Sequence, residues 1–337
     1  MTEIYPVEIG VARQIRTTDA IFDLVRDDLR NVENAIDIES FASVHTVSPI
    51  SSYLQRNGGE PLRAALLLLC ARFAGGSGNR MAVQLGAVVE MMHAAALIHN
   101  EMVDVEQTPR DRPSRDIPWD RTTCVLAGDW LYLCAFRVAL QERALDLAID
   151  AAQMMVTGEL TQISRIGCVA VTEADYMELV YCKTASLFSL CGKLGAMAAG
   201  ANTRVGDKLA EFAWNLGMAF QLIDDLLDFM PGDSEHGKPT GGDLRDGIVT
   251  LPLVYALEQA SASERNLVAA ILRDRNYDDV SFANVQALVD RYGGTQRTRA
   301  RARQFTDRAR QIVAEFPDSF CRRALFTLTE LVTERDC

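Results

Sequence analysis

Three carboxylates inside an otherwise apolar run are the residues of this sequence best placed to do chemistry. Residues 219–229 read Ala-Phe-Gln-Leu-Ile-Asp-Asp-Leu-Leu-Asp-Phe, and the acidic positions are Asp224, Asp225 and Asp228. Residues three and four apart share one face of a helix, so all three carboxylates can point into one space. Burying them together is costly unless a cation joins them. Mg²⁺ suits such a site, because it binds one or two carboxylates together with waters and substrate phosphates. The alternative, a solvated acidic face, is disfavoured by the apolar neighbours.

A second polar trio lies upstream in a similar apolar run. Asn100, Glu101 and Asp104 repeat the spacing of the first trio. Two such faces opposed across a cavity would form a metal clamp for a diphosphate. Because Asn100 is neutral, this trio carries one negative charge fewer than three aspartates would. The alternative here is a helix end that emerges into solvent.

The elements that must position these residues are helical nearly throughout the sequence. The apolar residues Ile21, Val25, Leu29, Val32 and Ile36, for example, recur at spacings of three and four. Helices are expected at 62–74, 80–104, 120–141, 143–165, 173–199, 204–230, 250–260, 263–273, 280–292, 296–315 and 318–334. No alternating strand pattern is present. The sequence therefore predicts an all-α fold, with residues 1–337 forming a single-domain bundle of about ten to thirteen helices around a central apolar cavity.

Some of these helices are apolar on nearly every face, and they are expected to form the centre of the bundle. They are residues 80–104, 120–139, 173–199 and 204–230. Their residual apolar surface predicts a dimer, either a homodimer or a hetero-oligomer with a paralogue, because exposed apolar patches tend to mark interfaces. The longest predicted loops are 108–118 and 231–247, and long loops in compact domains are often functional.

Composition excludes several classes of protein. The net charge is −12 and no long basic run compensates it, which argues against nucleic acid as a partner. The eight cysteines contain no Cys-x-x-Cys pair and no zinc-like spacing with histidine. The N-terminus does not read as a signal peptide, and no apolar run approaches the roughly 18 residues of a membrane span. We therefore expect a cytoplasmic protein without a transmembrane segment.

Several motifs in order resemble the trans-prenyl diphosphate synthases, the polyprenyl synthetase family, from about residue 56 to the C-terminus. The matching segments are residues 90–99, 126–129, 183–188, 221–228, 237–239, 242–244 and 250–253. The segment 221–228 is the family's second aspartate-rich motif without change. The resemblance implies an isoprenoid synthase-like fold and a Mg²⁺-dependent prenyltransferase.

The family resemblance also implies a reaction and a role for each candidate residue. An allylic prenyl diphosphate ionises, isopentenyl diphosphate attacks the allylic cation, and a proton is lost. Up to three Mg²⁺ ions and the cations of the site stabilise the leaving diphosphate. The implied metal ligands are Glu101, Asp104, Asp224, Asp225 and Asp228. The implied contacts to the allylic diphosphate are Lys183, Thr184, Gln221 and Lys238, and those to isopentenyl diphosphate are Arg63, His93 and Arg110.

Departures from the family pattern cluster on the acceptor side and in the first acidic motif. Glu60 stands where the family has a phosphate-binding lysine, and Pro61 follows it. Asn100 and Glu101 replace two aspartates. Pro109 replaces an arginine, and Ile248 replaces a lysine before Thr250. A lysine-to-glutamate change reverses charge beside a diphosphate, and each unit pair 4 Å apart is worth about 4 kcal/mol at an effective dielectric of about 20.

These departures leave three functions open. The first is a prenyltransferase that condenses an allylic prenyl diphosphate with isopentenyl diphosphate. The second is an enzyme that ionises one prenyl diphosphate without condensation, as terpene synthases do. The third is a non-catalytic partner subunit of a paralogous synthase. For the first, the small residues Ala94, Ala95 and Ala96 before the first acidic motif favour a product of C20 or longer over C15.

Overall fold

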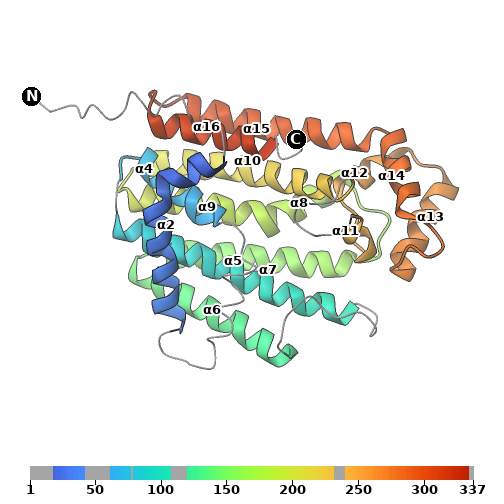
Figure 1. Ribbon diagram of the computed structural model, residues 1–337, viewed down its shortest axis with the longest axis horizontal. Coiled ribbons are helices and arrows are strands. Elements are labelled where there is room, and N and C mark those ends of the chain that lie inside the picture. The colour runs from blue at the N-terminus through green and yellow to red at the C-terminus, as the bar shows by residue number, and fades with distance from the viewer. Residues whose placement is uncertain (1–17, 42–60, 77–78, 108–119, 231–239, 334–337) are drawn as a thin grey trace, which may run out of the picture.

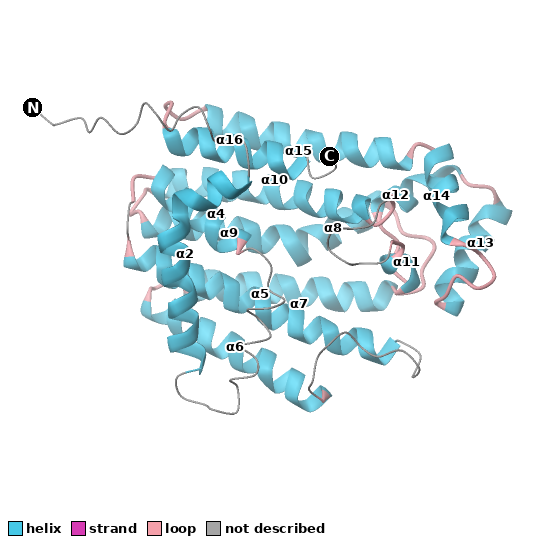
Figure 2. Cartoon of the chain, viewed as in Figure 1, coloured by secondary structure: helices cyan, strands magenta, loops and turns pink. Residues whose placement is uncertain are grey.

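The computed structural model describes residues 18–41, 61–76, 79–107, 120–230 and 240–333, and these residues form helices without any strand (Figure 2). The predicted all-α class is therefore confirmed. The helices are α2 (Thr18–Phe41), α4 (Leu62–Phe73), α5 (Arg80–Gln107), α6 (Arg121–Gln141), α7 (Leu145–Arg165), α8 (Glu173–Val180), the π-helical turn η2 (Tyr181–Ala185), α9 (Ser186–Ala198), α10 (Thr203–Leu227), α11 (Gly242–Arg245), α12 (Leu251–Gln259), α13 (Ala262–Asp274), α14 (Phe282–Arg291), α15 (Gly294–Ala314) and α16 (Phe320–Thr333).

Most predicted helices lie within a few residues of their expected bounds, and two segments differ. The helix expected at 173–199 is interrupted by η2, which changes the direction of the side chains that follow. The loop expected at 231–247 contains the short helix α11. Its first backbone N–H groups, those of Gly242 and Asp243, donate to the Asp228 carboxylate at 3.0 and 3.3 Å. The first difference includes the predicted site residues Lys183 and Thr184, and the second contacts the predicted site residue Asp228.

The core of the bundle is centred on α10, which packs lengthwise against α9 on one side and α15 on the other (Figure 1). Its inward side chains, among them Leu209, Phe212 and Leu216, are fully buried. Removing such apolar side chains from water is the main force that holds these helices together. The acidic end of α10 is therefore held by a rigid, well-packed helix.

The helix α6 differs from the prediction that residues 120–139 lie at the centre. It lies at one edge of the bundle, next to α5 and α7 (Figure 1). Leu126, Leu133 and Leu140, spaced seven apart, remain 62%, 64% and 62% exposed. An apolar composition shows that a helix surface avoids water, but it does not show whether the same chain or another molecule covers that surface.

Two helical segments are long and apolar enough to cross a membrane by length and composition alone, contrary to the expectation that no apolar run approaches that length. They are Arg80–Asn100 in α5 and Arg121–Gln141 in α6. In their most apolar windows, 67% and 44% of the residues are buried inside the fold. A core helix of a bundle passes the same test, and for α5 burial within the bundle accounts for the apolar composition.

Candidate functional site

The three aspartates at the end of α10 have three different environments. Asp224 is exposed, whereas Asp225 is 7% exposed and accepts hydrogen bonds from the Tyr176 hydroxyl at 2.6 Å and the Gln221 amide at 2.7 Å. Asp228 accepts from the backbone at the start of α11. Two of the three carboxylates are thus engaged by protein donors, and both Asp224 and Asp228 lie close enough to Asp225 to raise its pKa. Their role as metal ligands stays a prediction.

Burial favours the protonated, neutral form of the Asp225 carboxyl group. Desolvation is the largest effect and raises the pKa of Asp225 to about 7, although the hydrogen bonds from Tyr176 and Gln221 oppose it. The neighbouring carboxylates Asp224 and Asp228 raise the pKa further. Without a cation, the proton is therefore bound to this carboxyl group more tightly than to an exposed aspartate.

The hydrogen bonds of Asp225 continue to the π-helical turn η2. The Thr184 hydroxyl donates to the Gln221 side-chain oxygen at 2.8 Å, and Gln221 in turn donates to Asp225. Thr184 is only 7% exposed, so this line of bonds lies under the surface of the site. The structure thus brings together three residues that the sequence placed in one site, Thr184, Gln221 and Asp225.

Lys183, the residue before Thr184, points to a different helix. Its ammonium nitrogen lies 3.0 Å from a carboxylate oxygen of Glu159 and 3.0 Å from the side-chain oxygen of Gln162, both on α7. The same Glu159 oxygen accepts a hydrogen bond at 2.8 Å from the side-chain amide of Asn100 on α5. Gly158 permits this approach, because a Cβ there would lie 3.0 Å from the Lys183 backbone nitrogen. The adjacent residues 183 and 184 therefore join α5 and α7 on one side to α10 on the other.

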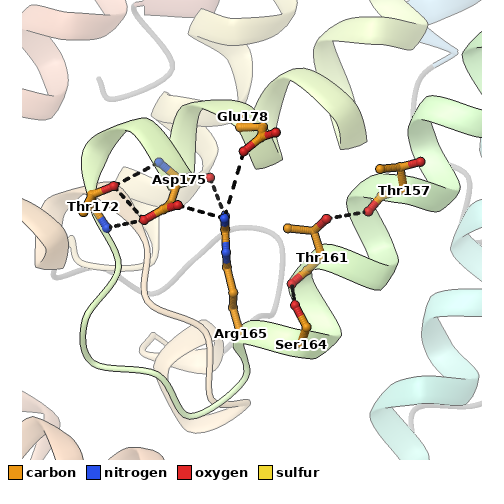
Figure 3. Close-up of polar contacts among 7 residues, drawn as sticks. All are labelled: Thr157, Thr161, Ser164, Arg165, Thr172, Asp175 and Glu178. Atoms are coloured by element: carbon orange, nitrogen blue, oxygen red, sulfur yellow. Dashed lines mark hydrogen bonds and ion pairs between the residues drawn. The ribbon is translucent and has the colours of Figure 1, made fainter.

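Arg165 connects the end of α7 to the start of α8 (Figure 3). The Arg165 guanidinium at the end of α7 donates to the carboxylate and the backbone oxygen of Asp175, each at 2.8 Å, and lies 4.0 Å from Glu178. Asp175 and Thr172 also form the capping box that begins α8. One arginine thus holds the end of the helix that carries Glu159 against the start of the helix that leads to Lys183.

Arg63 and His93 lie together in a second, largely buried cluster with Glu90. The Arg63 guanidinium lies 5.3 Å from the centre of the Phe188 ring, and the Glu90 carboxylate accepts the backbone N–H of Ala64 at 2.8 Å. Burial lowers the pKa of His93 well below its usual value, with a smaller contribution from the charge of Arg63. His93 is therefore neutral at physiological pH.

Two carboxylates act on the charge of Arg63, but one of its donors is unused within this cluster. Burial lowers the pKa of Arg63, whereas Glu90 and Asp224 oppose that effect. Its Nε nitrogen is buried and has no hydrogen-bond partner among the residues that the structure describes. A buried cation with an unused donor can bind an anion.

An apolar pocket of about 280 Å³ opens beside Glu159, between α5, α6 and α7. Its lining residues are Ala96, His99, Asn100, Val125, Tyr132, Met155, Val156, Glu159 and Leu160. The His99 ring lies 3.2 Å from the backbone oxygen of Val125 and 3.5 Å from the Asp129 carboxylate. Of the three small residues expected at a cavity floor, Ala96 lines the pocket, whereas Ala94 and Ala95 are packed in the core.

Several predicted site residues lie outside the described part of the chain. Arg110 and Lys238 belong to segments whose placement is not described, and the same holds for the side chains of Glu101 and Asp104 on α5. Within the described residues, no three histidine, cysteine, aspartate or glutamate side chains form a group able to hold a metal ion. The predicted metal clamp stays a prediction.

Sequence reasoning missed four residues that the structure adds to the site: Glu159, Gln162, Tyr176 and Glu90. Glu159 and Gln162 are three apart on α7 and so share a face. A polar pair on an amphipathic helix looks like ordinary solvated surface, and only packing against η2 and α5 distinguishes it.

An all-α bundle with an apolar pocket, a nearby lysine and carboxylates at a helix end has the features expected of an enzyme that binds diphosphates of apolar molecules. The model of one family, described as polyprenyl synthetase, matches residues 44–289. The chain therefore belongs to the polyprenyl synthetase family, and the predicted class of prenyltransferase is confirmed.

Relatives of known name extend over nearly the whole chain. The octaprenyl diphosphate synthase of Escherichia coli is 29% identical over 321 residues, with 94% of this chain and 99% of that protein covered. A short chain isoprenyl diphosphate synthase of Methanothermobacter thermautotrophicus is 30% identical over 324 residues, with 93% and 99% covered. Relatives at the same level of identity thus carry names that differ in product length.

The fold agrees with a solved structure of the same kind. The polyprenyl synthase of Caulobacter crescentus, complexed with calcium and isoprenyl diphosphate, superposes with a TM-score of 0.86 at 29% identity. The match covers 96% of this chain and 100% of that one. The isoprenoid synthase-like architecture predicted from the sequence is therefore confirmed.

Proposed function

We propose that this protein condenses an allylic prenyl diphosphate with isopentenyl diphosphate to give a trans-prenyl diphosphate of C20 or longer. The observation that carries the proposal is the position of Lys183. It pairs with Glu159, which lines the apolar pocket, while its neighbour Thr184 bonds to the residues around Asp225. A diphosphate bound near Lys183 would thus have its apolar chain beside the pocket.

The carboxylates of the site fit Mg²⁺ by their chemistry, since this ion takes oxygen ligands from one or two carboxylates and from substrate phosphates. Asp224 is exposed and available to such an ion. When bound, Mg²⁺ would neutralise charge developing on the leaving diphosphate. We assign metal binding, with up to three ions, to Glu101, Asp104, Asp224, Asp225 and Asp228.

The other residues of this chain bind and orient the two substrates. Lys183, Thr184, Gln221 and Lys238 are assigned to the allylic diphosphate. Arg63, His93 and Arg110 are assigned to isopentenyl diphosphate. The buried Arg63 with an unused donor supports anion binding in its cluster, and a neutral His93 donates a hydrogen bond without adding charge. The apolar walls of the pocket keep water from the allylic cation.

Product length is set in this proposal by the pocket between α5, α6 and α7. Ala96 leaves one wall open, whereas Tyr132 is the largest side chain of the lining. The pocket has a volume of about 280 Å³, and the small side chain at 96 supports a chain longer than C15.

We further propose that residues 1–337 act as one domain and that the protein is a cytoplasmic homodimer. Packing continues from α2 to α16, which supports a single unit. The exposed leucines of α6, with Leu160 of α7 at 63% exposure, support an apolar interface on that edge of the bundle.

Incubation of purified protein with Mg²⁺ and farnesyl diphosphate, with and without labelled isopentenyl diphosphate, tests the proposal. Longer labelled prenyl diphosphate that forms only with isopentenyl diphosphate is the expected result. Hydrocarbon or alcohol formed without it would instead establish single-substrate ionisation. Lys183→Gln should reduce turnover about 100-fold, since a cation at the leaving group is lost. The matched change Lys193→Gln, at a surface lysine paired with Asp207, should leave turnover unchanged.

A further inference from the structure

One carboxylate oxygen connects three elements at the edge of the apolar pocket. Glu159 Oε1 on α7 accepts a hydrogen bond from Asn100 Nδ2 on α5 at 2.8 Å and lies 3.0 Å from Lys183 Nζ in η2. The side chains of Glu159 and Lys183 are only 21% and 29% exposed, so water screens these contacts weakly. Asn100 precedes Glu159 by 59 positions and Lys183 follows it by 24, so the tertiary fold brings the three side chains together.

We propose that Asn100 is a positioning residue that holds Glu159, and through it Lys183, at the edge of the pocket. Asn100 departs from the family's first acidic motif, and it leaves that trio with one negative charge fewer than three aspartates would give. The structure gives the amide another use, which the family's aspartate could not serve. An ionised aspartate has acceptors alone, so it cannot donate to Glu159.

The charges of the neighbouring side chains also favour asparagine over aspartate at position 100. Glu159 and Lys183 carry one negative and one positive charge, and the neutral amide of Asn100 leaves the group balanced. An aspartate at position 100 would place a second carboxylate within hydrogen-bond distance of Glu159, and like charges at such separations repel. Lys183 would then lie between two carboxylates, and only its contact with Gln162 would stay as it is.

The role of Lys183 in binding the allylic diphosphate rests on the proposed function, but the contact itself does not. In this arrangement Lys183 is already oriented before any substrate binds. An oriented cation loses less conformational entropy when it meets a diphosphate. Asparagine at position 100 thus removes one negative charge from the acidic trio, and it also fixes the position of the nearby Lys183.

A double-substitution cycle on the metal-free protein tests the contact without any need for activity. Asn100→Asp should lower the apparent melting temperature by about 3 °C, because it creates a like-charge pair. Glu159→Gln removes that repulsion, and its amide can donate to the new aspartate. The pair Asn100→Asp with Glu159→Gln should therefore recover at least half of the loss. Asn284→Asp, the same chemical change at an exposed position of α14, should have almost no effect.

Steady-state kinetics test the positioning role. Asn100→Asp should raise the KM for farnesyl diphosphate about tenfold, the loss of one charge-assisted hydrogen bond, and should leave the KM for isopentenyl diphosphate nearly unchanged. The double substitution should restore the KM. A lower Mg²⁺ requirement in Asn100→Asp, with an unchanged KM, would mean that position 100 is a metal ligand and would overturn the proposal.

The two measurements separate failure of this inference from failure of the proposed function. Additive melting shifts in the cycle would refute the contact between positions 100 and 159, whatever the activity. An enzyme inactive toward both substrates, with strongly non-additive melting shifts, would refute the proposed function and support the contact.

Discussion

Replacing Asp225 with asparagine is expected to remove a large pH dependence from the stability of the metal-free protein. The carboxyl group is 7% exposed, and burial raises its pKa to about 7. In the unfolded chain the pKa of an aspartate is about 3.9. The folded protein therefore holds the proton over a pH range in which the unfolded chain has already lost it.

The sign and size of the effect follow from this difference. The stabilising contribution of the protonated group is complete below about pH 4 and is lost as the pH rises through 7. A difference of about three units, at 1.36 kcal/mol each, corresponds to about 4 kcal/mol. Asparagine has no proton to lose, so the stability of the variant relative to the wild type should rise by that amount between pH 4 and pH 8.

Scanning calorimetry in the presence of a chelator, at intervals from pH 4 to pH 8.5, measures this difference. For a chain of 337 residues, about 4 kcal/mol corresponds to a relative shift of about 5 °C in melting temperature. The asparagine keeps an acceptor for Gln221 but presents an amide to Tyr176, which adds an offset that does not depend on pH. The exposed Asp150 provides the control, since Asp150→Asn should give a curve parallel to that of the wild type. A parallel curve for Asp225→Asn would refute the reasoning.

Three further outcomes are expected at and near the pocket. Gly128→Ala should destabilise the protein by about 1–3 kcal/mol, because the new Cβ would overlap the His99 ring. The double substitution Gly128→Ala with His99→Ala should recover much of the lost melting temperature. Tyr132→Ala should lengthen the products, as judged by chromatography, and products no longer than those of the wild type would show that another residue limits the chain. Leu133→Glu should convert a dimer into a monomer in light scattering, because it places a charge on the exposed apolar face of α6, while its helix content in far-UV circular dichroism should change little.

Local sequence pattern was sufficient to predict most helices, since their apolar positions recur at helical spacing and Gly, Pro or polar clusters separate them. The stripe of α2 is an example, with Ile21, Val25, Leu29 and Val32 all buried. The pattern did not predict η2, because a π-helical turn has no clear composition of its own. It also did not predict α11, which depends on backbone donation to Asp228 from residues 14 and 15 positions away.

The candidate site was predictable to the extent that its residues form motifs. Lys183, Thr184, Gln221 and Asp225 were all identified from the sequence, and hydrogen bonds connect the last three in the structure. Glu159 was not identifiable, since a glutamate on an amphipathic helix has no local signal of function. Its importance arises only where α7 packs against α5 and η2.

The sequence by itself determined the helical class, the family and the chemistry of the acidic motifs, because these depend on residue type and on spacing within single helices. Tertiary structure decided how each polar residue is used. It left Asp224 exposed, buried Asp225 beneath Tyr176, and turned Asn100 toward Glu159. The physical reason is that the charge state and partner of a polar group depend on what surrounds it, and those neighbours come from helices distant in the sequence.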